Sequence, residues 1–144
     1  MDTVTVNTLF ERTCLLAGCA LIGLYFILPA ISKIQDFEGT SAYMAAHDVP
    51  MIQVLLVLTI IIQLSAGTAL IIGFKGRWAA FLLAGLTLVI SLFMHNFWTY
   101  EDGLEKAHEL QNFFKNMGIM AGLLIVAGLG TGPLSLDNRI SLTN

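Results

Sequence analysis

Charged side chains are scarce in this sequence. They make up 12% of the 144 residues, whereas 56% of the residues are hydrophobic. Soluble domains carry about 25% charged residues. The mean hydropathy is +0.79. A chain with so few charges cannot cover the surface of a water-soluble domain, so the sequence predicts a protein integrated into a membrane.

Cysteine is also nearly absent, and the short motifs of familiar soluble enzymes are missing. Cys14 and Cys19 are five residues apart, so on one helix they would point about 140° apart and could not form a disulfide. We interpret both as packing residues. The sequence contains no CxxC pair, phosphate-binding glycine loop or nucleophile elbow. It therefore has no self-contained catalytic motif, and whether the chain is an enzyme stays open.

Long apolar runs, by contrast, are abundant. Four of them cover residues 13–32, 51–74, 78–98 and 109–129, and each is near the ~20 residues that cross a ~30 Å hydrocarbon layer as a helix. The pattern predicts an all-α fold, a bundle of four transmembrane helices forming a single domain over residues 1–144. Between the first two runs, residues 34–48 are typical of a short amphipathic element.

Four spans place both termini on the same side of the membrane. That side carries four basic residues and the opposite side carries three, namely Arg12, Lys75, Arg77 and Arg139 against Lys33, Lys106 and Lys115. The positive-inside rule therefore favours cytoplasmic termini. The opposite, outer side carries seven of the ten acidic residues. Such an acidic face argues against nucleic acid as a partner, because that binding needs clustered basic residues.

A polar stripe leads into the fourth apolar run. Five of its residues fall within one sector of about 120° on a helix: His108, Glu109, Asn112, Lys115 and Asn116. A membrane helix normally turns such a face toward a bundle interior or a wet cavity. With His95 and Lys33 on the same outer side, these residues form a candidate ligand-binding pocket. The alternative is an interfacial cap in which Lys115 reaches up to the water.

The same residue types permit two metal-based alternatives. A haem could lie between His95 and His108, and a divalent metal could bind His95, His108 and Glu109. Residue type alone supports both, so we assign no metal site.

Gln63 is the other embedded polar residue, about 18 Å from the start of the second span. A buried amide in that position needs partners. We predict that it bonds a neighbouring helix, through hydroxyl groups such as those of Thr87 and Ser91, and otherwise contacts a ligand as a deep site separate from the outer pocket. Gly118 and Gly122 have the GxxxG spacing that allows close helix packing.

These residues belong to a longer pattern. Its first half consists of GLYF at 23–26, SKI at 32–34, FEGT at 37–40 and PM at 50–51, and its second half of GF at 73–74, His95, FW at 97–98 and NFFKN at 112–116. In order and spacing, the pattern resembles the DoxX-type family of integral membrane proteins over nearly the whole chain. The resemblance implies a small four-helix protein of the bacterial inner membrane, associated with quinone-linked redox complexes. Family members often carry Glu where this chain has Gln63, so a carboxylate that could relay protons is missing.

Two functions follow as hypotheses. The first is a subunit or accessory of a quinone-linked redox complex, with quinone as its possible cofactor and the other subunits as its partners. The alternative is a non-catalytic module that binds membrane lipid or assists assembly of membrane proteins, including further copies of itself. A transporter has less support, because no paired charges lie at the predicted midplane.

Overall fold

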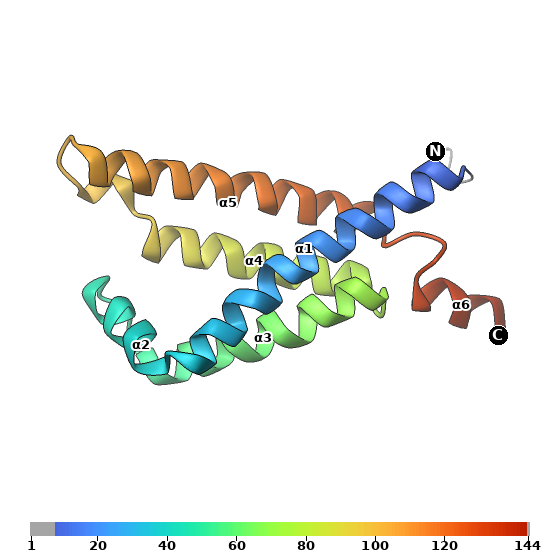
Figure 1. Cartoon of the computed structure of the whole chain (residues 1–144), viewed down its shortest axis with the longest axis horizontal. Coiled ribbons are helices and arrows are strands. Elements are labelled where there is room, and N and C mark those ends of the chain that lie inside the picture. The colour runs from blue at the N-terminus through green and yellow to red at the C-terminus, as the bar shows by residue number, and fades with distance from the viewer. Residues whose placement is uncertain (1–7, 144) are drawn as a thin grey trace.

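The computed structural model describes residues 8–143, and Figure 1 shows its helices. Their order is α1 (Leu9–Gln35), α2 (Phe37–Ala46), α3 (Ile52–Ile72), α4 (Gly76–Met94), the 3₁₀ turn η1 (Phe97–Thr99), α5 (Leu104–Leu129) and α6 (Leu136–Thr143). No strand occurs in the described residues, and four helices are long and apolar enough to cross a membrane. The predicted all-α, four-helix fold is confirmed. Residues 1–7 and 144 of the predicted domain lie outside the described part.

The helix ends differ from the predicted spans where polar residues continue a helix beyond its apolar part. The helix α1 begins at Leu9 instead of residue 13, because Thr8 and Glu11 form a capping box at its start. The helix α5 begins at Leu104 instead of residue 109. In contrast, α4 ends at Met94, four residues before the predicted end at residue 98.

The amphipathic element predicted for residues 34–48 is present as α2. Asp36 ends α1 and caps α2, because its Oδ1 accepts a hydrogen bond from the amide of Gly39 at 3.0 Å. One residue thus serves both helix ends and turns the chain sharply. As a result, α2 lies across the end of the bundle opposite the start of α1, which is named the outer end after the predicted orientation.

Two glycines allow a close crossing between α1 and α3. A Cβ atom on Gly23 would lie 2.7 Å from the carbonyl oxygen of Gly67, and one on Gly67 would lie 3.0 Å from that of Gly23. The predicted packing role of Gly118 and Gly122 is not found at Gly118, because a Cβ added there would have no atom within 4 Å. A Cβ added at Gly122 would lie in ordinary contact with Ile22, at 3.6 Å. Spacing alone did not show which face of α5 meets another helix.

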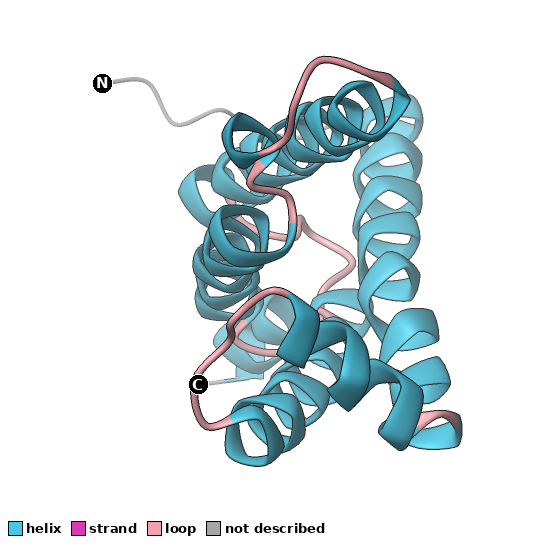
Figure 2. Ribbon diagram, turned by 90° about the vertical axis from the view of Figure 1, so that its left-hand side faces the viewer, coloured by secondary structure: helices cyan, strands magenta, loops and turns pink. Residues whose placement is uncertain are grey.

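The inner half of the bundle is a closely packed apolar core. Its fully buried members include Leu70, Leu83 and Leu123, with Cys19 among them, whereas Cys14 is exposed. Helix α1 packs mainly against α3 and α4 mainly against α5, while α1 and α5 touch little. Figure 1 shows these two helices close at the end that carries the start of α1 and diverging toward the other. Figure 2 shows the long helices arranged around the bundle centre from the side that carries α2. The outer half therefore has room for a cavity.

The C-terminal segment fastens the turn between α3 and α4. Lys75, the residue before α4, has a positive φ of 46° and no capping bond of its own. The carboxylate of Asp137 supplies the cap, accepting from the amides of Lys75 at 2.8 Å and Gly76 at 3.1 Å. A negative charge there also suits the helix dipole.

We expect Asp137→Ala to lower the free energy of unfolding by about 1–2 kcal/mol, because it leaves two helix-start amides without their acceptor. Thermal unfolding in detergent measures this effect. Asp102→Ala is the matched control, because Asp102 is exposed and bonds only the side chain of Lys106. Equal melting temperatures for the two variants would contradict the capping role.

Candidate functional site

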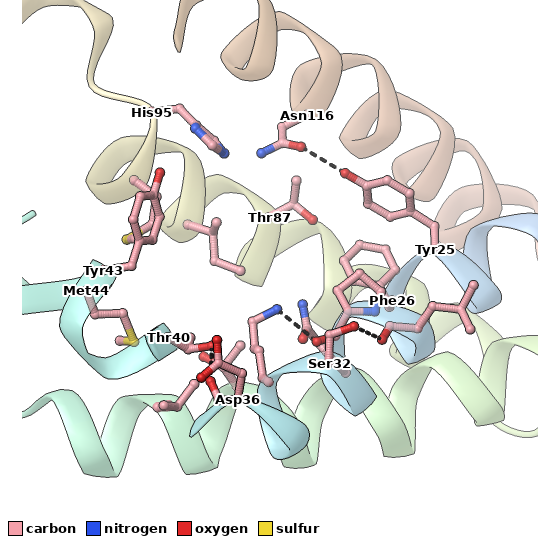
Figure 3. A pocket seen from close by; sticks show the side chains of 18 of the residues that line it. Tyr25, Phe26, Ser32, Asp36, Thr40, Tyr43, Met44, Thr87, His95 and Asn116 are labelled. Atoms are coloured by element: carbon pink, nitrogen blue, oxygen red, sulfur yellow. Dashed lines mark hydrogen bonds between the residues drawn. The ribbon is translucent and has the colours of Figure 1, made fainter. Parts of the chain in front are cut away.

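A cavity of about 710 Å³ occupies the outer half of the bundle, within the ~300–1,000 Å³ typical of small-molecule sites. Helices α1 to α5 all contribute to its wall, and Figure 3 shows most of its side chains. The structure brings five of the eight predicted site residues onto this wall, Lys33, Gln63, His95, Lys115 and Asn116. Asn112, His108 and Glu109 do not line it.

His95 stands where α4 ends, and Glu109 on α5 fixes its ring. The ring Nδ1 lies 2.7 Å from Glu109 Oε2, and the two side chains are only 18% and 17% exposed. When the carboxylate accepts a hydrogen bond from Nδ1–H, the other ring nitrogen, Nε2, is left for a ligand. Glu109 thus acts behind the cavity wall by orienting His95.

His108 lies apart from this arrangement. Its side chain is exposed and does not line the cavity. Within residues 8–143, no three His, Cys, Asp or Glu side chains are grouped closely enough to hold a metal ion. The two metal-based alternatives therefore lose the grouping that they require, because His108 does not share the cavity with His95.

Asn116 ties three helices together beneath the cavity. Its Oδ1 accepts a hydrogen bond from the hydroxyl of Tyr25 on α1 at 3.3 Å, and its Nδ2 donates to Ser91 Oγ on α4 at 3.1 Å. Figure 3 shows the first of these bonds. Asn116 is 6% exposed, so its polar groups are satisfied by protein. Its neighbour Lys115 is exposed at the rim and donates to Asn112 Oδ1 at 2.9 Å.

Gln63 lies in the same cavity, which corrects its predicted place as a separate deep site. Its side chain is 4% exposed and its Oε1 has no hydrogen-bond partner. The predicted bonds to neighbouring helices are absent, because Thr87 and Ser91 donate instead to backbone carbonyls one turn back on α4. A buried amide oxygen without a partner is costly in a membrane interior. Gln63 is therefore the strongest single mark of a ligand contact.

Lys33 brings a cation to the cavity without a neighbouring acid. Its Nζ donates only a long bond of 3.4 Å to the carbonyl of Pro29. In the described residues, the ion pairs are those of His95 with Glu109 and Lys106 with Asp102. Asp36, which also lines the cavity, uses its carboxylate to cap α2. An electron-rich ligand group would complete the surroundings of Lys33.

Sequence reasoning did not identify Tyr25 or the α2 residues as parts of the cavity wall. The α2 residues are Gly39, Thr40, Tyr43 and Met44. Burial and the nearby Glu109 and Tyr100 raise the pKa of the Tyr43 phenol, so it stays protonated at neutral pH. A buried Asn116 needs hydrogen-bond partners, and this need was the only signal for Tyr25. A single sequence could not show that the partner lies on α1.

The chemistry of the site is that of binding. Its wall is mainly apolar, with side chains such as Phe26, Leu56 and Met94. Polar groups that a ligand could use come from α1, α3 and the end of α4: the ammonium of Lys33, the unpartnered amide oxygen of Gln63 and the Nε2 of His95. This combination suits an amphiphilic ligand with a polar ring or head group.

Comparison with known proteins agrees with this architecture. The family model "DoxX" matches residues 14–96. "Inner membrane protein YphA" of Escherichia coli is 31% identical over 87% of this chain and 88% of its own length, and "Inner membrane protein YqjF" of the same organism is 31% identical over 91% and 95%. "ER-derived vesicles protein ERV29" of Saccharomyces cerevisiae is 26% identical over 56% of this chain, but only 26% of its own length. No solved structure matches.

The similarity covers both halves of the chain, and the four apolar helices are those of a multi-pass inner-membrane protein. The side on which the termini lie stays a prediction. The family predicted from the sequence pattern is confirmed, and this chain belongs to the DoxX family.

Proposed function

We propose that the chain binds a membrane quinone in the outer cavity, as a subunit or accessory of a redox complex. The observation that carries the proposal is the unpartnered amide of Gln63, buried in a mainly apolar cavity that also holds Lys33 and His95. A quinone ring is flat and apolar, with two carbonyl oxygens that accept hydrogen bonds. An apolar wall suits the flat ring, and the donors on this wall suit its two carbonyl oxygens.

The three polar groups divide the work of holding such a ring. Lys33 donates from α1, Gln63 donates from the adjacent α3, and His95 at the end of α4 offers Nε2, so the ring carbonyls can bond to groups from different helices. The orphaned Oε1 of Gln63 would accept a hydrogen bond from a hydroxyl group of the quinol form of such a ligand. The quinone supplies the redox chemistry when bound. The chain supplies position and hydrogen bonds.

A partner subunit supplies the electrons in this proposal. The two cysteines do not line the cavity, since Cys14 is exposed and Cys19 lies in the inner core. The side chains on the cavity wall bind and orient rather than accept electrons. An accessory role therefore fits the cavity better than a self-sufficient enzyme.

The test is a binding titration of the purified protein with a ubiquinone analogue that carries a ten-carbon tail. We expect saturable binding that Lys33→Met weakens by about tenfold, which is the ~1.4 kcal/mol of one charge-assisted hydrogen bond. Lys106→Met is the matched control, because Lys106 pairs with Asp102 outside the cavity. If the native chain binds no quinone, or if the two variants bind it equally, the proposal fails.

The redox role has its own readout. The quinone-reductase activity that depends on this chain should be lower in membranes from cells that produce the Lys33→Met variant in place of the native chain. With the Lys106→Met variant in its place, the activity should equal that of the native chain. Retention of a phospholipid in the cavity, with no effect of Lys33→Met on that activity, would favour the alternative of a lipid-binding or assembly module.

A further inference from the structure

The cavity has a mouth on the side of the bundle, and its rim can be identified by exposure. Most wall residues deep in the cavity are buried, such as Leu56 and Thr87. Asp36, Gly39 and Tyr43 are exposed at the outer end of the wall, and along the side three wall residues of α1 are exposed, Tyr25, Leu28 and Ser32. These three α1 residues follow one another at three- and four-residue intervals, so they lie within about 60° on one face of the helix. Their exposed side faces away from the bundle.

The opposite rim belongs to α5. Lys115 lines the cavity and is also exposed, and the neighbouring Asn116 closes the floor through its bond with Tyr25. Below this bond α1 and α5 meet, as the contact position of Gly122 with Ile22 shows. Above it they diverge (Figure 1). The mouth therefore opens between α1 and α5.

The mouth lies at the depth of the lipid chains. Tyr25 is about 15 Å along the axis from Gln35 at the outer end of α1, and Asn116 is about 20 Å from Leu129 at the inner end of α5. Both distances fall inside a hydrocarbon layer of about 30 Å. The mouth between α1 and α5 thus faces lipid, while Asp36, Gly39 and Tyr43 mark a separate exposed part of the wall at the outer end.

The polar groups of the rim are arranged as lipid exposure requires. Ser32 Oγ donates to the carbonyl of Leu28 on its own helix, and the Tyr25 hydroxyl is used by Asn116. The ammonium of Lys115 donates to Asn112, one turn nearer the outer surface. The hydroxyl groups of Ser32 and Tyr25 thus find partners within the protein, and the ammonium of Lys115 has one.

From this geometry we propose that the ligand enters the cavity sideways from the lipid layer, through the mouth between α1 and α5, with its tail left in the mouth. The proposal rests on the cavity being a ligand site, as above, and it narrows the ligand to molecules dissolved in the membrane. A quinone with a long isoprenoid tail cannot be enclosed in about 710 Å³. Its ring would reach Gln63 while the tail lies along Leu28.

One test measures the surroundings of the mouth without any ligand. In a background with Cys14→Ser and Cys19→Ala, a spin label is placed at Leu28→Cys and the protein is reconstituted in phosphatidylcholine vesicles. We expect frequent collisions with dissolved oxygen and few with a water-soluble nickel chelate. Leu24→Cys on the exposed face of α1 is the lipid reference, and Glu101→Cys in the outer loop is the aqueous reference. A nickel-accessible label, or one shielded from both reagents by a second copy or another protein, overturns the proposal.

A second test measures entry itself. Leu28→Trp should slow association of the ten-carbon-tailed ubiquinone analogue at least tenfold, with dissociation slowed similarly and Kd little changed. Leu24→Trp places the same bulk beside the mouth, since Leu24 does not line the cavity, and should leave both rates unchanged. Equal rates for the two variants overturn lateral entry. If the native chain binds no quinone, the proposed function fails, while the spin-label result still decides whether the mouth opens to lipid.

Discussion

Gln63→Leu should make the ligand-free protein more stable while weakening its binding of the quinone analogue at least tenfold. Leucine has nearly the same size but no polar atoms, so it removes the buried amide whose Oε1 has no partner. Such an orphaned group costs about 1–3 kcal/mol, and removing it should raise the free energy of unfolding by about that amount. The same change removes a hydrogen bond from the bound quinone ring. Thermal unfolding and a binding titration on the same preparations measure the two effects.

The opposite signs of these effects are what make the experiment decisive. Gln53→Leu is the matched control, because Gln53 lies on the exposed surface of the same helix, α3, and should alter neither quantity much. A Gln63→Leu variant that unfolds more easily would mean that the amide is stabilised by the protein alone. Unchanged quinone binding would mean that Gln63 does not contact the ligand.

Gly23→Val should destabilise the bundle by about 3 kcal/mol, at the upper end of overpacking effects. A Cβ at this position meets the carbonyl oxygen of Gly67 at 2.7 Å, and Ile71 lies closer still. The backbone of α3 cannot move aside as a flexible side chain would, so α1 must shift away from it. Chemical denaturation in mixed micelles measures the loss.

The control for this change lies on the same helix. A Cβ on Gly18 has no atom within 4 Å, so Gly18→Val tests the effect of valine on α1 without the helix crossing. We expect at most about 1 kcal/mol from it, and less if the lipid-facing valine packs well. If both variants lose the same stability, the crossing of Gly23 and Gly67 does not hold α1 against α3.

The number and order of the membrane-spanning helices could be predicted because each apolar run is long enough to cross the membrane. Their ends could not be predicted in the same way. Hydropathy marks the part of a helix that lies in lipid, whereas α5 extends back to Leu104 through a polar first turn. The capping box of Thr8 and Glu11 was a local signal that could have placed the start of α1 correctly.

The candidate site could be predicted only in part, because the prediction relied mainly on the residues that share one helix face. The stripe on α5 led to Lys115 and Asn116, which lie on the cavity wall, but also to His108, which does not. The sequence indicates how deep Gln63 lies along its span but not toward which neighbours its side chain points. Gln63 was therefore assigned to a separate site. Tyr25 and the residues of α2 depend on how α1 diverges from α5 and turns at Asp36, which a single sequence without contacts does not encode.

The bond between Asp137 and the start of α4 also bears on how the protein is made. The turn between α3 and α4 emerges from the ribosome more than 60 residues before its cap, as Lys75 and Asp137 are 62 positions apart. Until residue 137 has been synthesised, this hairpin lacks its acceptor, even with all four spans complete. The order of synthesis thus makes the last short helix the step that locks the hairpin, and chains interrupted before it would be recognisable by an unfastened inner turn.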